Sequence, residues 1–178
     1  MTATATHALR QQLLTMARYN VWATRRLLGC VDALSDDEYR RDVGLFFASV
    51  HGTLNHLLVA EHDVWFARIH DRHFPSQLRL DAEAESDRAR LREALLTRAE
   101  RWIPLLQACD DATLEGELAY KDLSGTDHRL PFAPTMAHVF NHGTHHRGQI
   151  SAALTMLGHP GPELDLIYML QEELHSRQ

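Results

Sequence analysis

Hydrophobic residues recur at helical spacing along four long segments of this chain. In each segment the apolar positions repeat every three or four residues, which is the period of an α-helix with one buried face. The segments run from about His7 to Leu34, Phe46 to Ile69, Ala84 to Cys109 and Pro134 to Leu157. Four long amphipathic helices with little strand between them predict an all-α four-helix bundle.

The residues between these segments predict shorter elements. Ser35-Asp36-Asp37-Glu38 has the composition of a capped short turn after the first helix. Pro104 lies inside the third helical pattern, and we expect a kink or an early end there because proline cannot donate the helical hydrogen bond. Short extended runs between Leu118 and Leu130, on either side of Gly125, predict a small β-hairpin before the last long helix. A short C-terminal helix is expected after Pro162.

Length and charge narrow the class of protein. A chain of 178 residues is the size of one domain, and we expect residues 1–178 to form a single bundle. The formal net charge is −6, so the chain lacks the basic surface on which direct nucleic-acid binding depends. It shows neither an apolar leader nor a run of about 18 apolar residues. We therefore expect a cytoplasmic protein without a membrane span, with Cys30 and Cys109 as reduced thiols.

Histidines carry the candidate chemistry. The chain has 13 histidines, and four of them lie within the nine residues from His138 to His146. His142 and His146 are four residues apart, so on a helix both imidazoles project from one face and can grip one metal ion. A third ligand must come from another segment, and His56 is the best candidate.

The angular positions of these residues support their meeting. At 100° per residue, His56 lies about 120° from the centre of the apolar stripe on its helix. His142 and His146 lie about 120° and 80° from theirs, on the same angular side. If the two helices are antiparallel and face each other, the rows converge. Three neutral imidazoles and a water form an open, catalytic-type site that suits zinc or nickel, whereas the plain alternative is a solvated histidine pair.

The remaining nearby histidines have weaker claims. His138 and His145 point away from the apolar stripe of the fourth segment, so we expect them to be exposed or to contact the ligands from outside. His51 and His62 lie on the opposite flank of the second segment from His56. None of the four is expected to bind the metal directly.

Two charged residues occupy positions where leucine would be expected. Glu61 and Arg147 both lie about 20° from the centres of their apolar stripes. A lone buried charge is costly, so we expect the two to pair across the bundle, unless one or both reach solvent. They are the candidate catalytic residues, because they are also placed to orient a substrate or the metal ligands.

Three stretches resemble one family. The first stretch is Gly52-Thr53-Leu54-Asn55-His56-Leu57-Leu58-Val59-Ala60-Glu61 with Trp65, and the second is His142-Gly143-Thr144-His145-His146-Arg147-Gly148-Gln149-Ile150. These two are similar to the first and second signatures of the DinB/YfiT-like metalloenzymes. The third stretch, Leu164-Asp165-Leu166-Ile167-Tyr168, is similar to the C-terminal part of the damage-inducible DinB branch. The resemblance implies a four-helix bundle of DinB/YfiT type with a long crossover connection. It implies a divalent metal, nickel or zinc, held by His56, His142 and His146. It also implies a homodimer.

The resemblance leaves the reaction open. Relatives in the wider family include thiol-dependent S-transferases, maleylpyruvate isomerase and proposed hydrolases, whereas the DinB branch has no settled reaction. An open tri-histidine metal site can lower the pKa of bound water, polarise a carbonyl or deprotonate a thiol. We therefore expect an enzyme that acts on a small-molecule substrate by thiol S-transfer or hydrolysis, with a low-molecular-weight thiol as a candidate cosubstrate. The alternative is a non-catalytic metal-binding stress-response or sensing protein.

Overall fold

A computed structural model describes residues 3–76 and 78–176, and it contains the four long helical segments that the hydrophobic pattern predicts. The elements that build the bundle are α1 (Ala3–Val31), α3 (Val50–Leu58) continued by the π-helix η1 (Val59–Asp71), α4 (Arg88–Glu100) followed by α5 (Trp102–Ala108), and α7 (Phe132–Met156). The helical class and the bundle are therefore confirmed.

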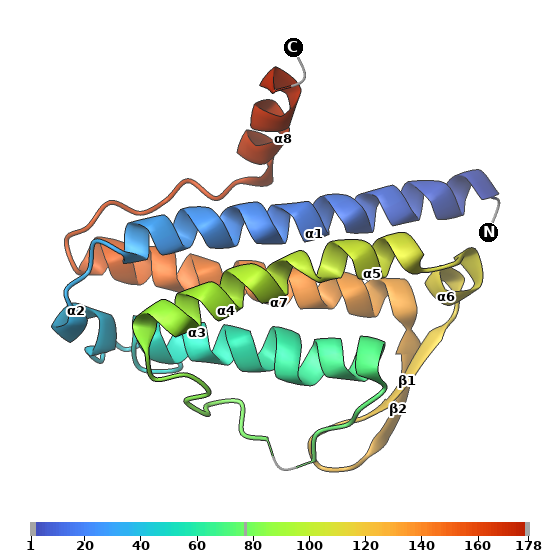
Figure 1. The fold of residues 1–178 in the computed structure, drawn as a ribbon, viewed down its shortest axis with the longest axis horizontal. Helices are drawn as coiled ribbons and strands as arrows, with labels where there is room; N and C mark the ends of the chain where they lie inside the picture. The colour runs from blue at the N-terminus through green and yellow to red at the C-terminus, as the bar shows by residue number, and fades with distance from the viewer. Residues whose placement is uncertain (1–2, 77, 177–178) are drawn as a thin grey trace.

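The long helices surround a common core (Figure 1). α1 packs against α7 and against the α4–α5 pair, and α3 packs against α4 and α7. α3 and α7 run in opposite directions, as the convergence of their histidine rows requires. After η1 the chain returns along the length of the bundle through residues 72–87 before α4 begins (Figure 1). This return is the long crossover, and it makes α4 parallel to α3.

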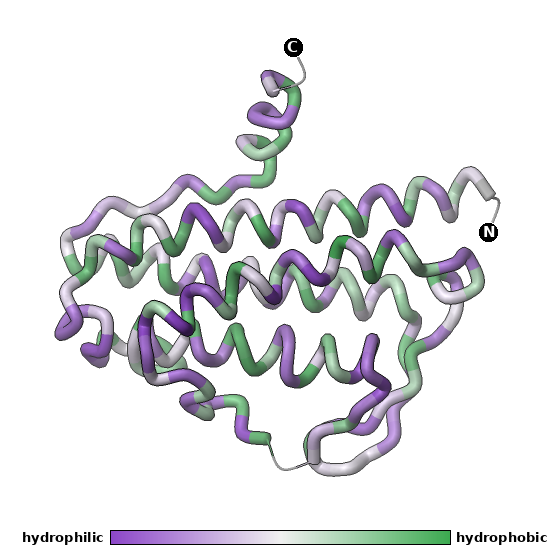
Figure 2. Tube along the Cα trace, viewed as in Figure 1, coloured by the Kyte–Doolittle hydropathy of each residue, from purple (hydrophilic) through white to green (hydrophobic). Residues whose placement is uncertain are grey.

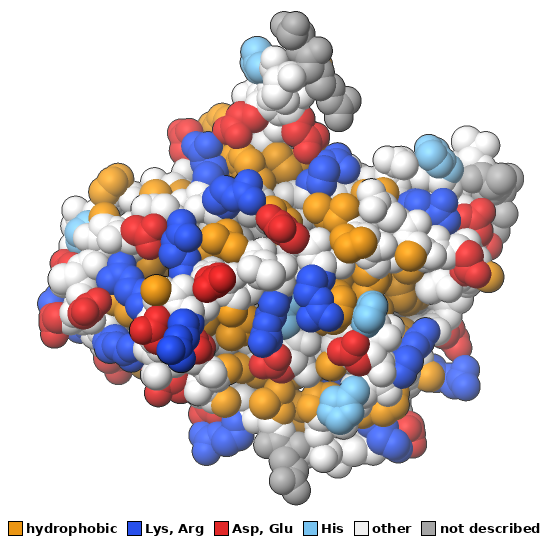
Figure 3. Space-filling view, in the orientation of Figure 1, with side chains coloured by type: hydrophobic (Ala, Val, Ile, Leu, Met, Phe, Trp, Pro, Cys, Tyr) orange, Lys and Arg blue, Asp and Glu red, His pale blue; other side chains and the backbone are white. Residues whose placement is uncertain are grey.

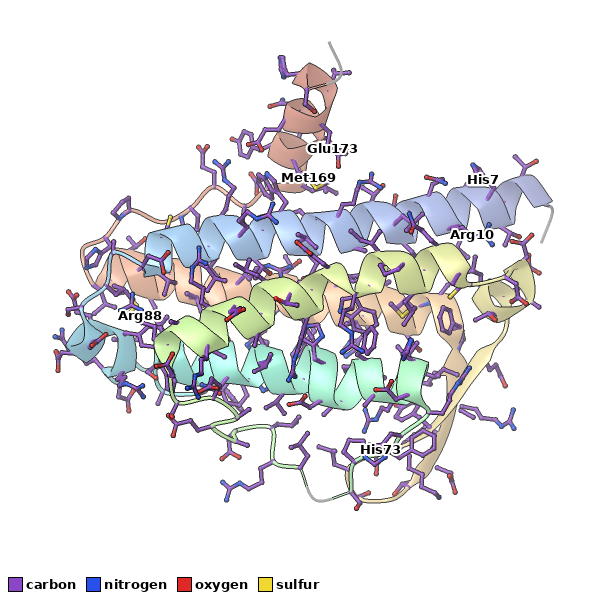
Figure 4. All side chains as sticks on the ribbon, in the orientation of Figure 1. His7, Arg10, His73, Arg88, Met169 and Glu173 are labelled. Atoms are coloured by element: carbon purple, nitrogen blue, oxygen red, sulfur yellow. The ribbon has the colours of Figure 1, made fainter. Side chains whose placement is uncertain are left out.

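The shorter elements also match expectation. α2 (Asp36–Arg40) begins with a capping box in which the Ser35 and Glu38 side chains satisfy each other's backbone amides. After the five-residue helix α6 (Asp111–Glu115), strands β1 (Glu117–Lys121) and β2 (Asp127–Pro131) pair antiparallel, which confirms the hairpin. α8 (Leu166–His175) stands away from the bundle in Figure 1, and Met169 at its base packs against α1 (Figure 4).

Some boundaries differ from the predicted ones for local reasons. The second helix begins at Val50 and not at Phe46, because Ser49 caps it after a loop in which Ala48 takes a φ of 63°. The third begins at Arg88, where the Asp87 side chain accepts a hydrogen bond from the Arg90 amide. The expected disruption near Pro104 is a break between α4 and α5, which leaves the proline in a first helical turn where no donor is needed.

The π-helical geometry of η1 corrects the angular positions predicted beyond Leu58. A π-helix turns by less than 100° per residue, so faces calculated for an α-helix drift along it. α-Helical angles place His62 on the flank opposite His56, and its side chain is buried there with its ring 6.2 Å from that of Trp102. The same angles place Trp65 in the apolar stripe, but it is only half-buried at the edge of the core and also lines a cavity.

The core contains two large apolar clusters, with a polar belt between them, and a third, smaller cluster. One large cluster contains Leu13, Trp102 and Phe140, and the other contains Leu27 and Ile150. The small cluster consists of Tyr19, Ala23 and Met169. Figure 2 shows hydrophobic and hydrophilic residues alternating along each helix. The belt, described below with the site, consists of buried polar side chains about midway along α1.

The surface mixes both signs of charge. On the face shown in Figure 3, Lys and Arg side chains lie among Asp and Glu side chains. Within the described residues, no helix is both long and apolar enough to cross a membrane.

Buried His62 predicts a loss of stability in acid. Burial, with the positive charges of Arg98 and Arg101, lowers its pKa to about 3. In the unfolded chain the pKa is about 6.5. Between these values only the unfolded state takes up the proton, so the free energy of unfolding falls as the pH drops, by about 2 kcal/mol at pH 5 from this group alone.

Urea unfolding at pH 7 and pH 5 measures this effect. We expect His62→Phe to reduce the loss of stability between the two pH values by about 2 kcal/mol. His73→Phe, at an exposed position, is the matched control and should leave the loss unchanged. An equal loss in wild type and His62→Phe would contradict the prediction.

Candidate metal centre

The structure brings together the three histidines that the sequence proposes as ligands. His56 comes from α3, and His142 and His146 come from α7. The Nε2 atom of His142 lies 3.2 Å from Nε2 of His56 and 3.1 Å from Nε2 of His146. The ligand atoms of all three lie within 4.8 Å of one another. This group is therefore able to hold one metal ion.

The outer nitrogens of two rings show which inner nitrogens carry lone pairs. His56 Nδ1 lies 2.8 Å from the backbone oxygen of Leu80, which can only accept, so Nδ1 carries the hydrogen. His146 Nδ1 lies 2.7 Å from Oε1 of Gln149 and donates to it in the same way. Both Nε2 atoms therefore present lone pairs to His142, which has at most one proton to give. Converging lone pairs of this kind fit a cation between them.

The protonation states agree with that fit. Burial, with repulsion from the neighbouring rings, lowers the pKa of His142 to about 3. Burial also lowers the pKa of His146 to about 4 and shifts that of His56 downward. All three imidazoles are therefore neutral at neutral pH, which is the form that binds a metal. The donor set fits a divalent ion that accepts nitrogen ligands.

Two supports of His56 were missed by the sequence analysis. The ring of Phe47 stacks on it, with centroids 3.8 Å apart and planes at 17°. The carbonyl of Leu80 fixes its tautomer from the crossover segment. Phe47 could have been noticed in the sequence, because it is an aromatic residue two positions before Ser49, which caps the helix. A backbone carbonyl leaves no signal in the sequence.

Asn55 holds the crossover against α3. Its side chain donates to the Glu85 carbonyl at 3.1 Å and accepts from the Glu85 amide at 2.9 Å. The side-chain Nδ2 of Asn55 also donates to the His51 carbonyl, so both polar atoms of the Asn55 side chain bind backbone groups. This clamp lies next to His56 in sequence and restrains the segment that carries Leu80.

Glu61 and Arg147 meet within the polar belt. Arg147 Nη1 lies 4.0 Å from Glu61 Oε1, and the two residues are 1% and 5% exposed respectively. Asn20 of α1 joins them: its Nδ2 donates to Glu61 Oε2 at 3.0 Å, and its Oδ1 accepts from Arg147 at 2.5 Å. Burial raises the pKa of Glu61, while Arg147 and Asn20 oppose that shift. The expected pairing is confirmed, and the alternative that these charges reach solvent is wrong.

Gly143 makes room for this cluster. A Cβ atom at Gly143 would lie 2.4 Å from Glu61 Oε1 and 2.9 Å from Arg147 Nη1. The missing side chain at position 143 therefore leaves the space that the Glu61 carboxylate and the Arg147 guanidinium occupy. Gly148, on the same helix, would meet nothing within 4 Å.

A cavity of about 420 Å³ opens beside the histidines. His56 and His142 form part of its wall, together with Trp65 and Arg68 of η1. His138 also lines it, whereas Glu61 and Arg147 do not. His138 and His145 are both exposed, as expected.

Comparisons with known proteins agree with this architecture. A family model described as "DinB family" matches residues 3–175. A relative named "Protein DinB", from Bacillus subtilis (strain 168), is 26% identical over 152 residues, which cover 83% of this chain and 87% of the relative. No solved structure matches the chain significantly.

The space at Gly143 yields a matched pair of variants. Gly143→Ala should destabilise the protein by about 1–3 kcal/mol, because the added methyl group displaces the buried cluster. Gly148→Ala should be neutral or stabilising by up to about 1 kcal/mol, because alanine favours helix and nothing obstructs it. Chemical denaturation of both variants measures the difference. Equal effects would mean that Gly143 is not tightly enclosed.

The buried pair should show energetic coupling. In a double-mutant cycle on Glu61→Gln and Arg147→Met, we expect a coupling of about 1–3 kcal/mol in the free energy of unfolding. The exposed ion pair of Asp32 with Arg92, 3.2 Å long, is the control, and its coupling should stay below about 1 kcal/mol. Additive effects at Glu61 and Arg147 would show that the two act separately.

Proposed function

This chain belongs to the DinB family, and we propose that it is a metal-dependent enzyme whose divalent ion, nickel or zinc, is held by His56, His142 and His146. The substrate is a small molecule, and the reaction is thiol S-transfer or hydrolysis. One observation carries the proposal: three neutral imidazoles converge on one point, and two of them, His56 and His142, line a cavity of about 420 Å³. Three nitrogen ligands leave a coordination position open, which distinguishes a catalytic site from a closed structural one.

Different residues of the chain would orient the metal ligands and line the space for a substrate. His56 is held in orientation by Phe47 and Leu80, and His146 by Gln149, so the lone pairs are aimed before any ion arrives. Side chains such as Trp65 and Val64 give the cavity a partly apolar wall. A bound divalent ion would supply Lewis acidity, which activates a water molecule or a thiol.

Glu61 and Arg147 would act as positioning residues. Neither lines the cavity, and both are engaged with Asn20. Gly143 lies between His142 and the buried pair, so the pair would hold α7 in the register that aims its histidines. A direct role in the reaction is therefore the weaker part of the sequence prediction.

The rest of the proposal concerns context. A low-molecular-weight thiol is the candidate cosubstrate. We propose a cytoplasmic homodimer that does not bind nucleic acid directly, which the net charge of −6 supports. The alternative is a non-catalytic stress-response or sensing protein of damage-inducible type. The cavity at the histidines favours the enzyme, because a sensor that only binds a metal has no need of space for a substrate.

Metal content tests the ligand assignment. The wild-type protein should bind about one nickel or zinc ion per chain, and each of His56→Ala, His142→Ala and His146→Ala should lower the affinity by about tenfold or more, since each removes one of three ligands. Elemental analysis and competition with a chelator provide the measurement. His138→Ala and His145→Ala are matched controls and should keep the metal. Full occupancy in all three ligand variants would refute the assignment.

Activity separates the enzyme from the sensor. The metal-loaded protein is assayed with a panel of thiols and electrophiles for S-transfer, and with esters and amides for hydrolysis. Any turnover should disappear after chelation and in His142→Ala. Metal binding without turnover across both panels would favour the non-catalytic alternative.

A further inference from the structure

Arg68 is a buried cation in the wall of the histidine cavity. It projects from η1, is 4% exposed, and lines the same cavity as His56 and His142. Its guanidinium carbon lies 4.9 Å from the ring centroid of Trp65 and 4.7 Å from that of Tyr120. The two aromatic rings hold the guanidinium in place but supply no negative charge.

Among the described residues, no group forms a hydrogen bond or an ion pair with this cation, although the Asp122 carboxylate attracts it at longer range. Arg68 Nε is buried without a hydrogen-bond partner. Within residues 3–76 and 78–176, no hydrogen bond from Arg68 is formed and no carboxylate oxygen lies within 4.0 Å of its guanidinium nitrogens. Arg147, the other deeply buried arginine of the site region, also has an unpartnered Nε, but its Nη1 contacts both Glu61 and Asn20. A buried charge normally requires such a partner.

The acidic residue in the same wall, Asp122, forms its hydrogen bonds with other groups. Asp122 lines the cavity, but its Oδ1 accepts hydrogen bonds from the Ser124 and Thr126 amides. Its Oδ2 lies 2.8 Å from Nε2 of His128. These contacts hold Asp122 in the hairpin turn. The guanidinium of Arg68 therefore has the long-range attraction of Asp122 but no contacting partner, and a ligand in the cavity can provide one.

We propose that Arg68 binds the carboxylate of a small organic molecule, so that the substrate of the histidine site is a carboxylic acid. This inference rests on the proposed function and specifies its substrate class. The planar guanidinium matches the two oxygens of a carboxylate in a bidentate contact. A single arginine with Asp122 nearby favours one negative charge over the two of a phosphate. The volume of about 420 Å³ suits a small organic molecule, with Trp65 as an apolar wall.

The cavity also sets the orientation of that molecule. Arg68 and the histidines His56 and His142 border one continuous space. A carboxylate held by Arg68 leaves the remainder of the molecule to extend toward the histidine group. The reacting group would then lie away from the carboxylate, and the carboxylate would serve recognition.

Binding to metal-free protein tests the inference separately from the proposed function. Acetate, propionate and phenylacetate are each compared with the corresponding neutral amide, by calorimetry after chelation. At least one acid should bind about tenfold or more tightly than its amide, the factor expected for a charge-assisted hydrogen bond. Arg68→Met should remove the preference, and Arg68→Lys, which retains the charge without the planar fork, should keep part of it.

A matched variant and a second measurement complete the test. Arg101→Met removes another guanidinium, which lies 4.0 Å from the Phe66 ring at a different cavity, and should preserve the preference. Circular dichroism checks folding, and Arg68→Met should still bind one metal ion, so loss of the anion site and loss of the metal site are distinguishable. No acid preference in the wild type, an unchanged preference in both Arg68 variants, or tighter binding of inorganic phosphate than of every acid would overturn the proposal.

Discussion

The buried polar cluster of Glu61, Arg147 and Asn20 beside Gly143 is the constraint on which the site depends. The Glu61 carboxylate and the Arg147 guanidinium occupy the space that a side chain at position 143 would fill. Asn20 adds α1 to the same cluster, so a single set of polar contacts ties three helices together midway along the bundle. Apolar packing tolerates small shifts between helices, whereas a buried ion pair with fixed hydrogen bonds does not. The histidine separations of 3.1 and 3.2 Å require that rigidity.

Much of this arrangement can be predicted from the spacing of residues along an α-helix. That prediction fails where the helix changes from α to π geometry. His142 and His146 share a helical face by spacing alone, and His56 lies in the α-helical part of its segment, where 100° per residue holds. Glu61 and Arg147 were identifiable because a charge in an apolar stripe needs a partner. Beyond Leu58 the helix widens to π geometry, and angles calculated for an α-helix no longer place residues such as Trp65 correctly. The bundle and the group of three histidines were thus accessible from the sequence, but the cavity wall on η1 was not.

The groups that hold the histidine rings were harder to predict for another reason. Gln149 is three residues from His146, so a helical reading places it within reach. The Leu80 carbonyl and Phe47 come from the crossover and from a loop, and their positions depend on tertiary contacts such as the clamp of Asn55 on Glu85. Backbone atoms in long connections carry no residue-type signal. The structure is therefore needed to see that the crossover forms part of the site.

The two buried arginines show how the same side chain can serve the scaffold or the ligand. Arg147 has an anion within the protein: its Nη1 contacts a carboxylate and an amide on two other helices, although its Nε has no hydrogen-bond partner. Its charge therefore helps to fix the position of α7. Arg68 has aromatic rings around it and, among the described residues, no anion in contact with it, and it borders the cavity. Removing Arg147 should therefore disturb the aim of the histidines, whereas removing Arg68 should alter what the cavity binds. Because the two arginines belong to different helices, residues of η1 that line the cavity can change while the contacts that bring the histidines of α3 and α7 together stay intact.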